Sequence, residues 1–541
     1  MATTPPPVKP AALPYAEARG CKEWLNALPL TNIPQAQSLV LESLRALNAA
    51  EFEGLERLKC LELMRDKVAF LQGEQRARYF GKTLPLSPND TAAWANGRTL
   101  LEELENGYRR ALAIAATGEL AGHATLVRQR IIRYLGAQML FHAIVYRRFD
   151  PRLWMRLHEE YAAAERSGTA SEPVKDSLES DDGQSSIAES YAHVVLLQAA
   201  YLSELTAPQM DFVEALLRAW ARRVPLRPPG AEAPASGSYP LAVDLERDIG
   251  ARPLAHAEGR SSHRVLDTEQ LSRSLRKRIF ALQKDEDPAP LGLPPLGSGT
   301  ELLGLLTRLH RLWCEGAPPR PPAKVPAEKV AALAFGHAEI GFFVTGGKLF
   351  EQPDKKRELT RQEKQDIEVF GRVTERTQTM MLSEFNYATE SWIVVDEMMG
   401  AWRLQRPPTA SRGVAIGRLV AMRAGDSGGQ FYLGVLSALS QETDGRIIAT
   451  VTLFPGRPEV VPVRAADARN RANAQWVQGF RLPGLERINI PASLVVPSGV
   501  AARGRGIEIW EAGAPEDARR RKATVEDVLE HGTDFDRITT F

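Results

Sequence analysis

Residues 432–454, YLGVLSALSQETDGRIIATVTLF, contain two runs of apolar and β-branched residues on either side of an Asp444-Gly445 pair. Runs of this length are typical of strands, and Asp-Gly between two of them is typical of a tight hairpin turn. The pattern extends in both directions, with further short runs at residues 391–395, 417–422 and 460–464. Strands at this spacing predict an antiparallel sheet that closes into a small barrel.

The predicted barrel domain covers residues 351–541. Two more strands are expected at residues 493–496 and 506–511, because both are short apolar runs. The charged stretch 516–529 follows them, and we expect it to form a helix at the end of the chain. The C-terminal part is therefore expected to be an antiparallel β-barrel with a terminal helix.

Residues 21–224 have a helical pattern throughout. Asn32 followed by Pro34 marks the first clear helix start, because proline suits a first turn in which its missing N–H is not needed. Apolar residues then recur at three-to-four spacing, as in Leu58, Leu61 and Met64. The sequence thus predicts an all-helical N-terminal domain.

Three other stretches are expected to separate or flank these domains. The acidic segment 168–186 (GTASEPVKDSLESDDGQSS) has little to bury, which predicts a flexible loop inside the helical domain. Residues 225–350 alternate strand-like and helical pieces with dense Pro and Gly, which predicts a mixed α/β middle region. Residues 1–20 are expected to be disordered. The fold class is therefore a multidomain α+β protein.

Composition limits the functional classes. The 541 residues are 44% hydrophobic and 25% charged, with a net charge of +1, which is ordinary for a globular protein and gives no basic field for a nucleic-acid polymer. No apolar run is long enough to insert in a membrane. The three cysteines, Cys21, Cys60 and Cys314, are far apart in the sequence and form no disulfide or metal-binding motif, so we expect a cytoplasmic protein.

One string suggests an enzyme. Residues 425–429, GDSGG, match the nucleophile loop of trypsin-like serine proteases. That chemistry needs a histidine base and an orienting aspartate, and none of the nine histidines stands in the matching context. Five small turn-forming residues between two strands are what a hairpin requires. We therefore expect no catalytic residue, no metal site and no cofactor, and we interpret the protein as not being an enzyme.

Arginines before a strand offer a different kind of site. Arg372 and Arg376 are four residues apart, and Asp396 follows the strand at residues 391–395. Two planar guanidinium forks suit phosphates and the acceptor edge of guanine, and the carboxylate could accept from the guanine amino group or fix an arginine. Arg357 and Arg361 form a second pair with the same spacing, and either pair could instead be exposed arginines on a helix.

These motifs resemble the PilZ domain, the cyclic-di-GMP receptor module of bacteria. The resemblance lies in the RxxxR motif, about twenty intervening residues and DEMMGA at residues 396–401 near a small six-stranded barrel. The strings at residues 431–436 and 447–454 are similar to later strands of the family. The layout also resembles long proteobacterial proteins with a helical N-terminal region ahead of a degenerate PilZ-like barrel, on the string WLNALP at residues 24–29.

The second motif departs from the family pattern. Met398 stands where the family has a serine, and Ala401 stands where it has a glycine. Methionine cannot replace a hydroxyl group, and alanine does not readily adopt a positive φ. If the resemblance holds, these two changes impair the dinucleotide pocket unless other arginines compensate.

Two functional hypotheses follow. The first is a non-enzymatic cytoplasmic regulator that binds a cyclic dinucleotide, cyclic-di-GMP, at the barrel through Arg372, Arg376, Asp396 and the pair Arg357 and Arg361, and relays binding to a protein partner through the helical region. The alternative is a protein–protein interaction scaffold whose PilZ-like barrel no longer binds nucleotide. Met398 and Ala401 favour the second hypothesis, and the retained arginines favour the first.

Overall fold

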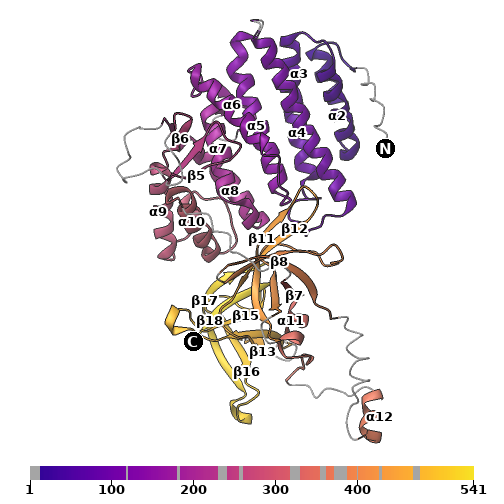
Figure 1. Cartoon of the computed structure of the whole chain (residues 1–541), viewed down its shortest axis with the longest axis vertical. Coiled ribbons are helices and arrows are strands. Elements are labelled where there is room, and N and C mark those ends of the chain that lie inside the picture. Colours follow the sequence, from indigo (N-terminus) through magenta and orange to yellow (C-terminus); the bar gives the residue numbers. More distant parts are fainter. Residues whose placement is uncertain are drawn as a thin grey trace. The chain divides into compact units, whose positions relative to one another are not determined.

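The computed structural model describes residues 13–116, 118, 120–179, 183–228, 240–254, 260–316, 329–353, 361–370, 387–398, 400–425, 429–466 and 475–541. The chain divides into two compact units, Met1–Pro319 and Arg320–Phe541. Helices make up most of the first unit, and the second contains strands that curl into barrels (Figure 1). The boundary falls inside residues 225–350, for which the sequence predicts a separate mixed region.

The first unit begins with helices that pack side by side. They are α1 (Ala18–Asn26), α2 (Ile33–Ala49), α3 (Gly54–Arg76), α4 (Pro88–Ala115), α5 (Ala124–Ala143), α6 (Arg152–Arg166), α7 (Ile187–Ala199) and α8 (Ala207–Trp220). The Asn32 side chain accepts a hydrogen bond from the Gln35 backbone N at 3.3 Å and caps α2, which confirms the helix start predicted there. Leu58, Leu61 and Met64 of α3 are buried, as their spacing predicts.

Regular structure begins closer to the first residue than the sequence predicts. We expected disorder over residues 1–20, but α1 begins at Ala18 and Tyr15 is buried. The Tyr15 ring lies 5.9 Å from that of Trp24, and its hydroxyl group hydrogen-bonds to Ser43 Oγ at 2.9 Å. Residues 1–12 lie outside the described part of the chain.

The acidic segment 168–186 also differs from the prediction of a flexible loop. It contains the paired strands β1 (Val174–Lys175) and β2 (Gln184–Ser185), and Asp176 between them is 1% exposed. The segment buries few apolar groups, but it buries a carboxylate that arginines of neighbouring helices hold in place. Residues 180–182 of this segment are not described.

A small antiparallel sheet and two helices complete the first unit. The sheet has the strand order β3 (Leu226–Arg227), β6 (His263–Leu266), β4 (Leu241–Asp244) and β5 (Arg252–Pro253). The helices α9 (Glu269–Gln283) and α10 (Gly299–Cys314) pack against each other, and the Trp313 indole N–H donates to the Leu196 carbonyl of α7 at 2.9 Å. These elements therefore belong to the helical unit.

The second unit contains a first closed antiparallel barrel. Its strands are β7 (Val330–Phe335), β8 (Glu390–Met398), β9 (Ala401–Gln405), β10 (Leu419–Ala424), β11 (Tyr432–Gln441) and β12 (Ile447–Leu453), in the order β7-β8-β9-β12-β11-β10. Helices α11 (His337–Val344) and α12 (Arg361–Phe370) lie between β7 and β8 in the sequence. The antiparallel pairing of β11 and β12 confirms the hairpin predicted at residues 432–454.

A second closed barrel follows. Its strands are β13 (Glu459–Ala465), β14 (Val477–Leu482), β15 (Ser493–Pro497), β16 (Gly506–Trp510), β17 (Arg520–His531) and β18 (Phe535–Thr540), in the order β13-β14-β15-β18-β17-β16. This order repeats that of the first barrel strand for strand. The single barrel expected from the sequence is thus two barrels with one topology, and the first begins at β7, before residue 351.

The predicted terminal helix at 516–529 is wrong, because most of it is strand β17. Ala523, Val525 and Val528 of β17 are buried, and β17 pairs with β16 on one side and β18 on the other. Charged residues surround these buried positions, and a register shift between Val525 and Asp527 interrupts the regular alternation of the strand. The charges and this shift together concealed the strand in the sequence.

The two barrels share a hydrophobic core. Leu419, Leu433 and Phe454 of the first barrel pack in one cluster with Phe480 and Phe535 of the second. Ile340 of α11 belongs to the same cluster, and α11 also contacts strands of both barrels. The barrels are therefore packed together rather than strung along the chain. In neither unit does a described helix have the length and hydropathy needed to span a bilayer.

Candidate functional site

Asp396 lies on β8 of the first barrel, where a β-bulge changes the direction of the side chains. Val394 pairs with Leu404 and the next pair is Asp396 with Arg403, so Val395 is the extra residue. Trp392 and Val394 are buried, and regular alternation would turn Asp396 to the same inner face. The bulge shifts the alternation by one residue and places Asp396 on the outer face of the barrel.

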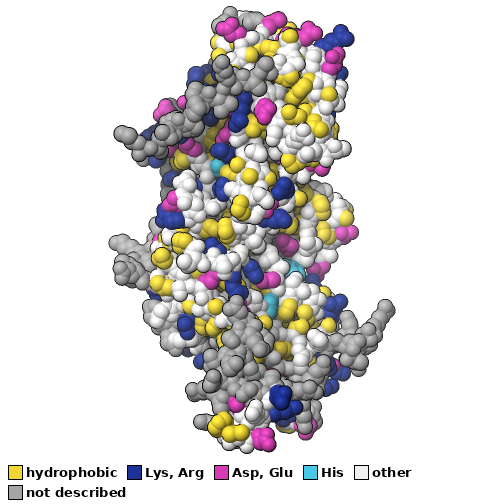
Figure 2. Space-filling model, turned by 90° about the vertical axis from the view of Figure 1, so that its right-hand side faces the viewer, with side chains coloured by type: hydrophobic (Ala, Val, Ile, Leu, Met, Phe, Trp, Pro, Cys, Tyr) yellow, Lys and Arg dark blue, Asp and Glu magenta, His cyan; other side chains and the backbone are white. Residues whose placement is uncertain are grey.

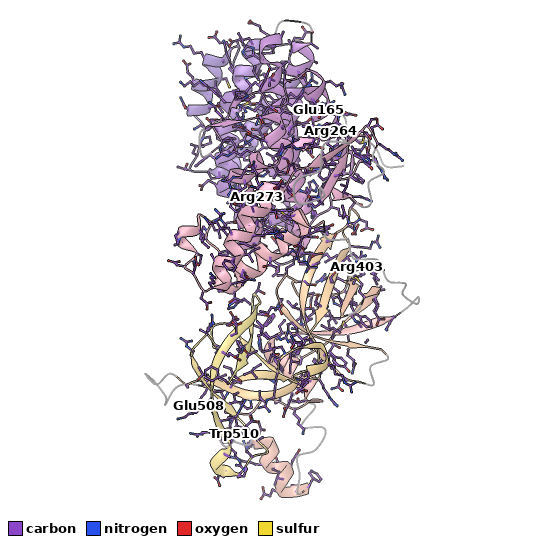
Figure 3. All side chains as sticks on the ribbon, turned by 90° about the vertical axis from the view of Figure 1, so that its left-hand side faces the viewer. Glu165, Arg264, Arg273, Arg403, Glu508 and Trp510 are labelled. Atoms are coloured by element: carbon purple, nitrogen blue, oxygen red, sulfur yellow. The ribbon has the colours of Figure 1, made fainter. Side chains whose placement is uncertain are left out.

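Arg403 of β9 holds the Asp396 carboxylate. Its Nη1 donates to Asp396 Oδ2 at 2.5 Å, and the side chains of Arg403 and Asp396 are 36% and 15% exposed. Figure 3 labels Arg403 on its strand. The pair is therefore a partly exposed charge-assisted hydrogen bond that fixes the carboxylate and keeps a guanidinium group beside it. A ligand that approaches this face meets one acceptor group and one cationic fork.

A second ion pair involves Glu397, the residue of β8 that follows Asp396. Lys329 Nζ donates to Glu397 Oε2 at 3.1 Å and lies 4.4 Å from the centre of the Trp402 ring, whose residue pairs with Glu397. The buried indole ring supports the ammonium group by a cation–π interaction. Two successive carboxylates of β8, Asp396 and Glu397, thus each pair with a cation, Arg403 from β9 and Lys329 from the residue before β7.

The turn between β8 and β9 shows which of its residues needs the backbone freedom of glycine. Gly400 has φ +76°, while Ala401 is the first residue of β9 and pairs with Met398. Position 400 is therefore the one that requires glycine, and Ala401, as a strand residue, does not need a positive φ. Met398, the last residue of β8, brings a thioether and no hydroxyl group to the hairpin.

The other predicted site residues are not brought to Asp396 by the described structure. Arg357, Arg372 and Arg376 lie outside the described residues. Arg361 is the first residue of α12 and is exposed. Arg403, which the sequence analysis did not select, is the arginine that contacts Asp396. A hairpin centred on Gly400 would have placed these two residues on facing strands, so the signal was present in the sequence.

The GDSGG string at residues 425–429 lies between two paired strands, as predicted. Strands β10 and β11 flank it and pair antiparallel, with Met422 opposite Tyr432, which confirms the hairpin. Ser427 itself lies outside the described residues. Among the residues that are described, no group of His, Cys, Asp and Glu is arranged to hold a metal ion.

The helical unit contains a separate concave site. A cavity of about 260 Å³ lies between α5, α7 and α8, and its lining includes Arg133, His193 and Arg218. Arg133 pairs with Glu179, and Arg218 pairs with Glu214 at 2.5 Å. The lining contains three arginines and three glutamates, so these side chains give the cavity no excess of positive charge to select an anion.

Next to this cavity, arginines from two helices surround Asp176. Arg65 of α3 donates to Asp176 Oδ1 at 2.5 Å, and Arg130 and Arg133 of α5 lie 3.2 and 2.8 Å from Oδ2. Burial by itself would raise the pKa of this carboxyl group, but Arg133, Arg65 and Arg130 together outweigh burial and lower the pKa to about 2. The carboxylate therefore joins the acidic segment to both helices.

The surface shows no broad field of one charge. On the face drawn in Figure 2, basic and acidic side chains are interspersed among the coloured residues, in line with the net charge of +1. A nucleic-acid polymer binds mainly through a continuous array of cations. The coloured residues on this face form no such continuous array.

Comparison with known proteins bears on the helical unit. Residues 19–231 match the family model for the N-terminal domain of the cyclic-di-GMP receptor FimW. The match covers less than half of the 541 residues and leaves both barrels outside it. No curated protein and no solved structure matched the chain. The helical part of this protein is thus similar to the N-terminal domain of a cyclic-di-GMP receptor.

Proposed function

We propose that this protein is a non-enzymatic cytoplasmic receptor that binds cyclic-di-GMP at the first barrel and signals to a protein partner through its helical unit. The observation that carries the proposal is the match of residues 19–231 to the N-terminal domain of a cyclic-di-GMP receptor. The barrels outside the match supply the structural setting for a ligand site.

The chemistry of the ligand fits the residues at and near β8. Cyclic-di-GMP presents two phosphates and two guanine bases, so a site for it needs cationic forks and a carboxylate that can accept from a guanine amino group. Asp396 lies on the outer face of the barrel, with Arg403 bonded to it at 2.5 Å. In the proposal, Arg372 and Arg376 add the forks that contact the phosphates, and the pair Arg357 and Arg361 stands close enough in sequence to assist.

The proposed relay depends on a difference in affinity. A ligand shifts a protein between two arrangements only to the extent that it binds one of them more tightly. The segments that carry the arginines connect β7 with β8, so a ligand that clamps them to Asp396 would restrict this connection. The protein partner would then bind the restricted form and the unrestricted form with different affinities.

Isothermal titration calorimetry of the full chain with cyclic-di-GMP tests the proposal. We expect saturable binding, and no comparable heat with GMP, which has a single base and a single phosphate. Arg446→Ala is the matched control, since Arg446 is an exposed arginine of the same barrel whose guanidinium group bonds to Asp444. That variant should bind as the natural chain does. Absence of binding at high micromolar cyclic-di-GMP would exclude the receptor.

An interaction scaffold is the second candidate, and Met398 is the observation that favours it. This residue places a thioether in the β8–β9 hairpin, at the position where the PilZ motif that the sequence resembles has a serine. A scaffold would capture its partner equally well with and without cyclic-di-GMP. Partner capture by the full chain, measured in both conditions beside the titration, separates the two functions.

A further inference from the structure

Two of the cysteines meet in the interior of the helical unit. Cys21 lies on α1 and Cys60 lies on α3, and neither has any exposed surface. The helices pack against each other, and the two thiol groups share a hydrogen bond. This pairing could not be predicted from the sequence, since the two residues are far apart in the chain.

The thiol pair lies where the N-terminal segment meets the helices. Tyr15, just before α1, contacts Cys21, and its hydroxyl group hydrogen-bonds to Ser43 Oγ of α2 at 2.9 Å. Tyr15 is itself 7% exposed. The two sulfur atoms therefore lie in a closed polar cluster that joins the N-terminal segment, α2 and α3.

The hydrogen bond makes the two thiols chemically different. The Cys60 thiol donates to the Cys21 sulfur, which lowers the pKa of Cys21 although burial acts against it. The same bond raises the pKa of Cys60, and burial adds to that effect. Because the thiolate is the reactive form, Cys21 is the sulfur that reacts first with an oxidant.

We propose that Cys21 and Cys60 form a reversible disulfide when the protein encounters a peroxide, and that this bond fixes α1 to α3. The Cys21 thiolate attacks one oxygen of hydrogen peroxide, which breaks the O–O bond, gives a sulfenic acid on Cys21 and releases hydroxide. The Cys60 thiol then attacks the Cys21 sulfur to form the S–S bond, and the sulfenic hydroxyl group leaves as water with the proton of the Cys60 thiol. In total, two thiols and one peroxide give one disulfide and two waters.

Access to the buried pair requires local opening of α1, and its anchorage suits that motion. This helix has nine residues, and the Glu17 side chain at its N-cap makes no capping hydrogen bond. The Ala18 backbone N instead donates to Glu56 Oε2 of α3 at 2.7 Å. Short elements with few anchoring hydrogen bonds open more readily than the core does. The Glu56 contact is thus the restraint that opening must break.

The test is oxidation of the full chain with hydrogen peroxide, followed by peptide mapping without reduction. We expect a linked peptide that joins Cys21 to Cys60, with a mass two hydrogens below the sum of its parts, and its disappearance after dithiothreitol. The Cys314→Ser variant is the control and should form the same link. Thiols that stay reduced, or a Cys21 that proceeds to the sulfinic acid without linking, would overturn the proposal.

Two variants examine the order of the steps and the access route. In Cys60→Ser, dimedone should trap a sulfenic acid on Cys21, and no link can form.

Glu56→Ala removes the acceptor for the Ala18 N–H, so the disulfide should form several-fold faster than in the natural chain. Glu23→Ala is its control, because Glu23 is exposed on α1 and pairs with the exposed Arg19. Equal rates in Glu56→Ala and the natural chain would refute the opening of α1.

Discussion

Asp534 of the second barrel accepts a hydrogen bond from the backbone N of Leu419 in the first barrel, at 2.8 Å. Asp534 lies in the turn between β17 and β18, and Leu419 begins β10. On the same turn, the Thr533 backbone N donates to the Gly417 carbonyl at 2.7 Å. Backbone groups of one barrel thus receive their partners from the other, which fixes the position of the two barrels against each other.

The first prediction concerns Gly532, at the start of this turn. A Cβ at this position would lie 2.2 Å from Phe535 Cε1 and 2.6 Å from the Gly417 carbonyl oxygen. We expect Gly532→Ala to lower the free energy of unfolding of the barrel unit by about 1–3 kcal/mol, because neither the core ring nor the backbone can move freely. Urea unfolding followed by tryptophan fluorescence measures the change.

Gly513→Ala is the matched control, in the connection between β16 and β17. None of the described atoms comes within 4 Å of a Cβ built there. This variant should keep the stability of the natural chain. Equal effects of the two substitutions would show that the turn does not hold the barrels together.

The second prediction concerns Asp176. Its removal leaves the buried cations Arg65 and Arg130, each 1% exposed, with one shared carboxylate, Glu62, in place of two. We expect Asp176→Ala to destabilise the helical unit by about 3–5 kcal/mol, the usual effect of breaking a buried ion pair. Asp211→Ala, which removes the half-exposed partner of Arg76, should cost less than about 1 kcal/mol. Urea unfolding followed by far-UV circular dichroism compares the two variants.

The third prediction is a loss of stability in weak acid. Burial lowers the pKa of His142 and of His193 to about 4, from an ordinary value of 6.5. Below pH 6.5 the unfolded chain binds these protons and the folded chain does not, so stability falls as the pH falls from 6.5 to about 4. Each imidazole adds a slope of up to about 1.4 kcal/mol per pH unit.

The pH dependence can be assigned with one variant. His193→Gln cannot take up a proton, so it should flatten the fall between pH 6.5 and 4 in urea unfolding of the full chain. Asp176 acts at lower pH. Since its pKa is lowered from 3.8 to about 2, its contribution is complete above pH 3.8 and is lost as the pH falls towards 2. An unchanged slope in His193→Gln would exclude His193 as its source.

The fourth prediction concerns the arginine pair at the proposed ligand site. Replacing Arg372 and Arg376 together by alanine should weaken cyclic-di-GMP binding by about tenfold or more, because a charge-assisted fork contributes about 1.5–3 kcal/mol. Titration calorimetry beside the Arg446→Ala control measures the difference. Unchanged affinity in the double variant, with binding present in the natural chain, would place the site elsewhere.

Local patterns predicted much of the fold. The Asn32 cap of α2, the stripe of apolar residues on α3 and the hairpin at residues 432–454 depend on neighbours within a few positions. The second barrel was missed because β17 begins with three consecutive exposed cations, Arg520 to Lys522, and a register shift between Val525 and Asp527 breaks its alternation. A charged run predicts a helix face as readily as the exposed side of a strand.

The site residues depend on contacts that no local pattern contains. Asp396 was selected from the sequence, but the bulge at Val395 that turns it outward and the cross-strand position of Arg403 follow from the pairing register. Asp176 looked like part of a solvated acidic loop, because its three arginines come from α3 and α5. The meeting of Cys21 with Cys60 likewise requires the packing of α1 on α3.

The apolar side chains that the two barrels bury against each other decide where the chain can be cut. A fragment that ends between β12 and β13 would lack Phe480 and Phe535 and leave Leu419 and Leu433 facing water. Freshly exposed apolar surface of this kind promotes aggregation. Truncations made near residues 319 and 320 avoid it, so expression of the barrels as one soluble product calls for a fragment that keeps both.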